Sequence, residues 1–344
     1  MRKRLFAGSI GLLAVLAAVA ATTAGASRKA DQLVGAGSSF VSPLMSQWQK
    51  DYPAKTGVNI VYSPSGSGAG IAAISARTVD FGASDAPLTP DQFTACKGCV
   101  QIPWALSATT IAYNVPGAPV HLNLSGPVIA NIFLGQITNW NDAAIKKLNP
   151  GANLPDLKIT PIFRSDGSGT TYNFTDYLSS VSPTWKTKVG NSTSVSFPTG
   201  IGARGSSGVA GLVSRTNGGI TYVDVAYAIK NHIKFAAVKN AAGKFLFPSL
   251  RRIAAAASAF PKVPANNEMH IVNPPKSDPL AYPISTYTYA IVPQQSTHAA
   301  ELRKLIFWAL TQGQQAKYTA PLLFVPLPKN VLVASEKTLK TIHT

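Results

Sequence analysis

The chain has 344 residues, long enough for two domains of ordinary size. Its formal net charge is +17, although only 13% of the residues are charged and 14 are acidic. The lysines and arginines are dispersed and no recognised nucleic-acid motif occurs, so the composition argues against a nucleic-acid partner. Two interpretations of the charge remain open: attraction of a small anion, and an acidic exterior habitat, where few carboxylates limit acid unfolding.

The first 26 residues have the pattern of a secretory signal peptide. Basic residues at positions 2–4 precede an apolar run from Leu5 to Ala21, and small residues follow at Ala24-Gly25-Ala26. A membrane anchor is the alternative, because the run is close to spanning length. The small-residue site favours removal. We therefore expect cleavage near Ala26, a remaining charge of +14 after three basic residues are lost, and a soluble, periplasmic protein.

Strands and helices alternate in the next part of the chain. Leu44, Met45 and Trp48 recur at helical spacing, and Gly57 is placed to end that helix. The predicted elements are a strand over 31–34, a helix over 41–52, a strand over 59–62, a helix over 69–76 and a strand over 79–82. This rhythm predicts an α/β fold with a mainly parallel sheet flanked by helices, in which ligands bind beyond the carboxyl ends of the strands.

The same rhythm continues to the end of the chain. The predicted elements are helices over 127–134 and 140–148, a strand over 159–163, a helix over 172–181, ordered segments over 206–213 and 220–229, a helix or loop over 254–257, a loop over 262–279, a strand over 287–293 and a helix over 299–311. Two extended segments, near 112–116 and 285–292, are predicted to carry the chain from one domain to the other and back. This predicts a second domain inserted into the first, with a two-crossing hinge that closes on a ligand. We expect domain I over 27–113 and 289–344 and domain II over 114–288.

Cys96 and Cys99 are the two cysteines of the chain and form the loop motif Cys-Lys-Gly-Cys. In an oxidising compartment this spacing favours a local disulfide. A thioredoxin-type redox pair requires a strand-to-helix junction of a small domain, and a zinc site requires two more ligands nearby. The five histidines are scattered without metal-ligand spacing, so we expect neither a metal site nor a cofactor.

Three polar, glycine-rich stretches precede predicted helices. They are Gly35-Ala36-Gly37-Ser38-Ser39-Phe40, Ser65-Gly66-Ser67-Gly68-Ala69-Gly70 and Arg164-Ser165-Asp166-Gly167-Ser168-Gly169-Thr170. Such turns present backbone N–H groups, hydroxyls and the positive end of a helix dipole to an anion, although a single serine there commonly caps its own helix. The guanidinium of Arg164 adds paired donors. Together the stretches predict a closed cage for a small oxyanion.

Asp85 follows the strand predicted over 79–82 and is a carboxylate in a cage of donors. It repels an anion unless that anion carries a proton to donate. Phosphate near neutral pH keeps at least one proton and sulfate keeps none, so a buried Asp85 predicts rejection of sulfate. The alternative is that Asp85 caps the following loop, which the sequence Asp-Ala-Pro permits.

The chain resembles the periplasmic phosphate-binding protein of the phosphate ABC transporter. The resemblance is carried by residues 35–40, 78–88 and 164–171, and matches at 135–142 and 148–151 extend it across most of the mature chain. It implies a two-domain type II binding-protein fold, phosphate as ligand and membrane permease subunits as partners. It also implies the phosphate ligands, which are Ser39 (side chain and backbone), Phe40 (backbone N–H), Ser67, Asp85 (proton acceptor), Arg164, Ser168, Gly169 and Thr170, with Asp166 paired to the arginine.

The sequence departs from that family at three places. Ser39 stands where the family commonly has threonine, the Cys96/Cys99 pair is unlike familiar members, and residues 244–273 match poorly. A hydrolytic enzyme is not expected, because Gly-x-Ser-x-Gly, a phosphate loop and metal ligands are all missing from the sequence. The remaining alternative is a binding protein for another oxyanion, namely sulfate, molybdate or arsenate. We expect a monomer.

Overall fold

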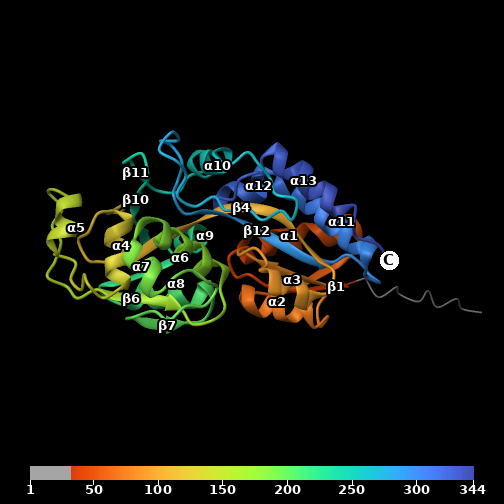
Figure 1. Ribbon diagram of the computed structural model, residues 1–344, viewed down its shortest axis with the longest axis horizontal. Coiled ribbons are helices and arrows are strands. Elements are labelled where there is room, and N and C mark those ends of the chain that lie inside the picture. Colours follow the sequence, from red (N-terminus) through yellow and green to blue (C-terminus); the bar gives the residue numbers. More distant parts are fainter. Residues whose placement is uncertain (1–31) are drawn as a thin grey trace, which may run out of the picture. The chain divides into compact units, whose positions relative to one another are not determined.

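The computed structural model describes residues 32–344 (Figure 1). The predicted signal peptide, residues 1–26, lies outside the described residues. Within residues 32–344, no helix combines the length and the hydrophobicity needed to cross a bilayer.

The elements alternate as the sequence predicts. The strands are β1 Gln32–Gly37, β2 Asn59–Ser63, β3 Phe81–Ser84, β4 Cys99–Asn114, β5 Asn123–Leu124, β6 Thr160–Arg164, β7 Ile201–Ala203, β8 Gly219–Asp224, β9 Lys234–Phe235, β10 Ala237–Lys239, β11 Phe245–Leu246 and β12 Ser285–Pro293. The helices are α1 Ser42–Thr56, α2 Ser67–Ser75, α3 Pro90–Cys96, α4 Gly126–Phe133, α5 Ala143–Leu148, α6 Gly169–Val181, α7 Pro183–Lys188, α8 Gly205–Arg215, α9 Val225–Lys230, α10 Leu250–Ser258, α11 Ala299–Leu310, α12 Ala316–Thr319 and α13 Lys329–Leu339, with 3₁₀ turns η1 Gln312–Gln314 and η2 Ala320–Leu322.

One sheet contains most of the strands, in the order β2-β1-β3-β12-β4-β8-β6-β7, with β9 paired to β4. Its two ends are parallel, since β1 pairs with β2 and β3, and β6 pairs with β7 and β8. The antiparallel strands β12 and β4 join these ends, because β4 pairs first with β12 and then, over 109–114, with β8. The predicted α/β fold is confirmed. The domain boundaries stay a prediction.

A buried aromatic cluster holds α1 against the sheet. Trp48 of α1 makes edge-on contacts with Trp104 of β4 and Trp308 of α11, with ring centroids 5.5 and 6.2 Å apart. Each such aromatic pair contributes about 0.5–1.5 kcal/mol beyond the burial of its surface. Gly57 ends the helix in the left-handed conformation, with φ 73°, as the sequence predicts. The cluster therefore fixes α1, and with it the turn from which α1 starts.

The boundaries of several elements differ from the predicted ones. β4 begins at Cys99 rather than near 112, because most of its residues are buried on both faces and lack the alternation that marks a strand in a sequence. β3 spans Phe81–Ser84, two residues later than predicted. α5 begins at Ala143 rather than at 140, because the side chain of Asp142 caps the N-terminus of the helix. The alanine-rich segment is helical within α10, and 262–279 is a loop as predicted.

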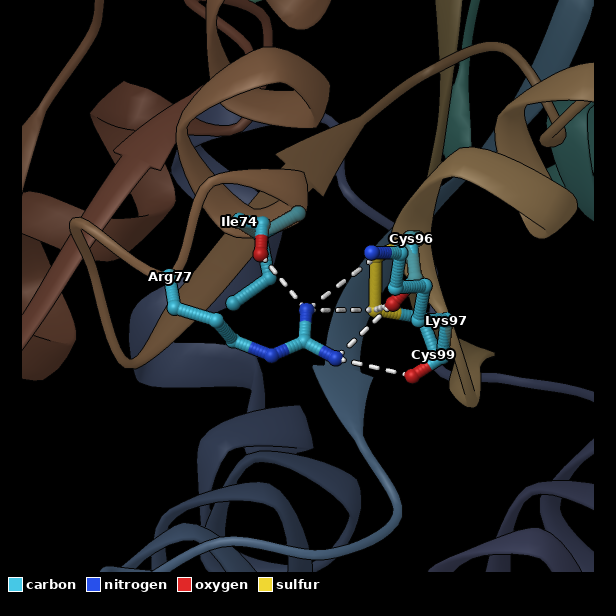
Figure 2. The surroundings of a disulfide bond; sticks show 5 residues. All are labelled: Ile74, Arg77, Cys96, Lys97 and Cys99. Carbon is cyan, nitrogen blue, oxygen red and sulfur yellow. Dashed lines mark hydrogen bonds between the residues drawn. A yellow bond between two sulfur atoms is a disulfide. The ribbon is translucent and has the colours of Figure 1, made fainter.

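Cys96 and Cys99 form the predicted disulfide, but the prediction that they lie in a loop is wrong. Cys96 is the last residue of α3 and Cys99 is the first of β4. Figure 2 shows Arg77, which follows α2, directed at this bond. Its Nη1 donates to the Ile74 carbonyl and lies 3.5 and 3.3 Å from the two sulfur atoms, while its Nη2 donates to the carbonyls of Cys96 and Lys97. Arg77 thus ties the end of α2 to the α3–β4 turn.

Candidate anion-binding site

The first glycine-rich turn joins β1 to α1 and requires glycine at position 37. Gly37 has φ 137°, and a Cβ there would lie 2.1 Å from the carbonyl oxygen of Ala83 on β3. This close approach places Ser38 at the carboxyl end of β3, where its N–H donates to the Ala83 carbonyl at 2.8 Å. The Ser38 hydroxyl donates to Oδ1 of Asp85. The turn therefore supplies a hydroxyl that the sequence analysis did not single out.

Asp85 lies immediately after β3 and is only 2% exposed. Its carboxyl group accepts hydrogen bonds from the hydroxyls of Ser38 and, at 3.4 Å, Ser67. The next loop is held instead by Ser84, whose Oγ accepts from the N–H of Ala86 at 3.1 Å. Burial raises the pKa of Asp85 to about 7, while the bonds from the two serines oppose that rise. Asp85 is thus a buried acceptor that titrates near neutral pH.

The third turn follows β6 and begins with Arg164, which is almost fully buried. Its Nε donates to Oδ1 of Asp166 at 2.7 Å, and its Nη2 donates to Oδ2 at 2.5 Å. Although burial opposes it, the bonds and the charge of Arg164 hold the pKa of Asp166 below its usual value. Ser168 caps α6 by accepting from the N–H of Thr171 at 3.1 Å. The hydroxyl of Thr170 is buried and has no hydrogen-bond partner within residues 32–344.

The second and third turns touch directly. The N–H of Gly68, in the first turn of α2, donates to the carbonyl of Gly167 at 2.9 Å. Gly169 lies so close to Asp85 that a Cβ would come within 2.6 Å of the Asp85 nitrogen and 2.7 Å of the Ser67 hydroxyl. Only a residue without a side chain fits there. The start of α6 therefore faces Asp85 and Ser67.

Ser39 contacts a residue that the sequence analysis missed, Ser206 at the start of α8. The two Oγ atoms lie 2.8 Å apart, and the N–H of Ser206 donates to the Ser39 hydroxyl at 3.1 Å. Nη1 of Arg164 donates to the Ser206 hydroxyl at 3.3 Å. Phe40 is fully buried beside this contact. A signal was available, since residues 204–208, Arg-Gly-Ser-Ser-Gly, are a fourth glycine–serine stretch ahead of a helix.

Two residues of β8 complete the surroundings, and no sequence motif marked them. The hydroxyl of Tyr222 accepts from the backbone N–H of Arg164 at 3.0 Å. Asp224, the last residue of β8, is 1% exposed. Burial, reinforced by the negative charge of Asp85, raises the pKa of Asp224 well above its usual value. The site thus contains a second buried carboxyl group.

These groups together suit a small anion that carries a proton. Hydroxyl groups and the N-termini of α2, α6 and α8 lie around two side chains. These are Arg164, which is paired with Asp166, and the buried carboxyl of Asp85. Within residues 32–344 no cluster of three or more His, Cys, Asp or Glu side chains could hold a metal ion. Cys96 and Cys99 lie apart from this network, because the only side chain bonded to their sulfurs is Arg77 among the described residues.

The chain is similar to several known proteins. Residues 22–312 match the family model described as the PBP superfamily domain. The chain is 44% identical to the phosphate-binding protein PstS of Xylella fastidiosa, over 88% of this chain and 84% of that protein. It is 39% identical to PstS of Pasteurella multocida over 95% of each chain. In fold it is similar to a solved phosphate-binding protein of Stenotrophomonas maltophilia, with a TM-score of 0.68 and 20% identity over 90% of this chain and 94% of that one.

Proposed function

Because the chain belongs to the PstS family of phosphate-binding proteins, within the PBP superfamily, we propose that it binds inorganic phosphate and delivers it to an ABC-type phosphate importer. The relatives are named as binding proteins and no catalytic family is indicated, so the proposed role is binding without turnover. The proposal places the mature protein in the periplasm as a monomer, with the membrane permease subunits as its partner.

The observation that carries the proposal is the buried carboxyl of Asp85 among donors. When Asp85 is ionised, it offers acceptors only, so a ligand beside it needs a proton of its own. Hydrogen phosphate has that proton and sulfate does not. Two acceptors held face to face without a proton cost about 1–3 kcal/mol or more, because each stays unsatisfied away from water. Asp85 therefore acts as the filter between the two ions.

The other ligands supply donors. In the proposed site phosphate is bound by Ser39, Phe40, Ser67, Arg164, Ser168, Gly169 and Thr170. The hydrogen bond from Ser38 to Asp85, the contact between Gly68 and Gly167 and the closeness of Gly169 to Asp85 support a single site made from all three turns. Asp166 holds the guanidinium of Arg164 in a fixed direction through two hydrogen bonds.

Closure of the site is proposed to occur by rotation of the two predicted domains, 27–113 with 289–344 and 114–288. Phosphate would enter the open form, and closure would remove it from water, which strengthens each hydrogen bond to it. The basic surplus of the chain would draw anions toward the open site over longer distances. The closed, loaded protein would then dock on the permease.

Calorimetry on the phosphate-freed protein at pH 8 tests this function. We expect tight binding of phosphate and arsenate, which share the same protonation, and sulfate and molybdate binding at least 100-fold more weakly. In Asp85→Asn the gap between phosphate and sulfate should narrow by about 100-fold, since about 3 kcal/mol of repulsion is removed. Asp91→Asn, an exposed carboxyl on α3, is the matched control. Sulfate that displaces phosphate at comparable concentration would overturn the assignment, and unchanged sulfate rejection in Asp85→Asn would remove Asp85 as the filter.

A further inference from the structure

We propose that Ser206, at the start of α8, is a positioning residue of the anion site: it directs the Ser39 hydroxyl at the ligand and ties it to Arg164. This inference rests on the proposed function, because Ser39 and Arg164 are among its proposed phosphate ligands. It adds a residue from a fourth turn, residues 204–208, to a site built so far from three.

Ser206 is fully buried and bonds to both residues at once. Its backbone N–H donates to Oγ of Ser39 at 3.1 Å, and the two hydroxyl oxygens lie 2.8 Å apart. Its own Oγ accepts from Nη1 of Arg164 at 3.3 Å. One small side chain therefore joins the first turn to the guanidinium of the third.

The hydrogen-bonding capacity of these groups fixes two of the bonds, and the direction of the third, between the two hydroxyls, is part of the proposal because either oxygen could be its donor. Nη1 of Arg164 can only donate, so the Ser206 oxygen accepts from it. In the proposed arrangement the Ser206 hydroxyl donates its own proton to Ser39. Ser39 then accepts two bonds, one from the N–H and one from the hydroxyl of Ser206, which fills both acceptor positions of its oxygen. The proton of Ser39 is left to donate to the anion. Hydrogen bonds that run in one direction along such a chain strengthen one another.

The same turn also supports the guanidinium from its other side. The N–H of Gly205 donates to Oδ1 of Asp166 at 3.0 Å, and that oxygen accepts from Nε of Arg164. Residues 204–208 thus contact Arg164 directly through Ser206 and indirectly through Asp166. Loss of the Ser206 hydroxyl removes only the direct route.

The contact also couples ligand binding to closure. Ser39 lies in the predicted domain I, whereas Ser206 and Arg164 lie in domain II; Ser206 is 167 positions from Ser39 and 42 from Arg164 along the chain. If the domains separate in the open form, the Ser39–Ser206 bonds form only on closing. Removing the hydroxyl should then speed phosphate release and leave capture unchanged.

The test compares Ser206→Ala with Ser207→Ala, an exposed neighbour in the same turn, and with Ser206→Thr, which keeps the hydroxyl. Phosphate affinity is measured by calorimetry and the rate constants by stopped flow. For Ser206→Ala we expect an affinity about tenfold weaker, with the loss in the dissociation rate and the association rate within twofold of wild type. Ser207→Ala should match wild type, and Ser206→Thr should recover to within threefold. Ser206→Gly gives the same test if the alanine variant fails to fold.

A double-mutant cycle with Ser39→Ala separates positioning from a general structural role. Without the Ser39 hydroxyl, the further effect of Ser206→Ala should fall to about threefold or less, because only the bond from Arg164 is then left to lose. The inference is overturned if folded Ser206→Ala binds phosphate as wild type does, if the loss lies in the association rate, or if it is undiminished in the Ser39→Ala background. A wild-type protein that binds no phosphate refutes the proposed function and this inference together, whereas a binding wild type with an indifferent Ser206 refutes the inference alone.

Discussion

The burial of Asp85 should make the ligand-free protein less stable at alkaline pH, and Asp85→Asn should restore that stability. Burial raises the pKa of Asp85 from 3.8 to about 7. Between these two values the folded protein binds more protons than the unfolded chain, so stability falls as pH rises through this window. The full cost above pH 7 is about 4 kcal/mol, because a tenfold change in proton affinity corresponds to about 1.4 kcal/mol.

The asparagine variant removes this ionisation cost and loses one hydrogen bond. Asp85 accepts from the hydroxyls of Ser38 and Ser67. An asparagine at this position has one acceptor oxygen, so one of those bonds is lost at a cost of about 1 kcal/mol. We therefore expect Asp85→Asn to be more stable than wild type by about 3 kcal/mol at pH 8, and by less than about 1 kcal/mol at pH 5, where the folded carboxyl is already protonated.

Urea unfolding of phosphate-freed protein at pH 5 and pH 8 measures both differences, with Asp91→Asn as the control for losing a surface carboxyl. Equal stability of Asp85→Asn and wild type at pH 8 would refute the reasoning, and so would a gain of the same size at both pH values. The expected outcome means that Asp85, the proposed filter residue, destabilises the empty fold above neutral pH.

Three further predictions follow from other contacts. Asp166→Asn leaves the charge of the buried Arg164 unpaired and should lower the free energy of unfolding by about 3 kcal/mol at pH 7, as measured by urea unfolding. Because the pKa of Asp166 is lowered in the folded protein, this difference between variant and wild type should disappear as pH falls below about 4. The double variant Cys96→Ser/Cys99→Ser should lose about 2 kcal/mol of stability, as expected for a short closed loop, with phosphate affinity unchanged by calorimetry. His270, whose pKa is raised to about 9 chiefly by Asp176, should be protonated at pH 7.5 by NMR titration; His270→Gln should cost less than about 1 kcal/mol, and that difference should vanish as pH rises through 9.

The local features of the fold and site could be predicted from the sequence. The helical spacing of nearby apolar residues predicted α1, and Gly57 predicted its end. Short motifs in the sequence likewise predicted the three glycine-rich turns. Such a turn can be recognised from its own residues, because a positive φ and a close approach to another backbone segment require glycine, as at Gly37. The pairing of Arg164 with Asp166, which the family resemblance implied, is also local, since the two residues are two positions apart.

The contacts between distant segments could not be predicted in the same way. Ser38 bonds to Asp85 across 47 positions and Ser39 bonds to Ser206 across 167, and a single sequence holds no periodicity that relates such pairs. β4 was predicted too short for a related reason, since a strand buried on both faces has no alternation and its partner β12 lies far along the chain. No sequence pattern marks Asp224, because what distinguishes this residue is its burial and the nearby charge of Asp85, which is distant along the chain.

The charges of the proposed site give a reason why the number of protons on an anion should decide whether it binds. Asp166 compensates the single positive charge of Arg164, which leaves two buried carboxyls, Asp85 and Asp224, and each raises the local cost of adding an anion. Burial raises the pKa of both carboxyls, and that of Asp85 lies at about 7, so Asp85 ionises as pH rises above neutral. In the proposed site, a ligand that brings its own proton shares it with Asp85 and adds no unpaired acceptor, while a fully deprotonated dianion would meet a bare carboxylate away from water. Long-range attraction by the basic surplus of the chain is the same for both dianions, so in the proposed site the discrimination arises at Asp85 and at the hydroxyls bonded to it.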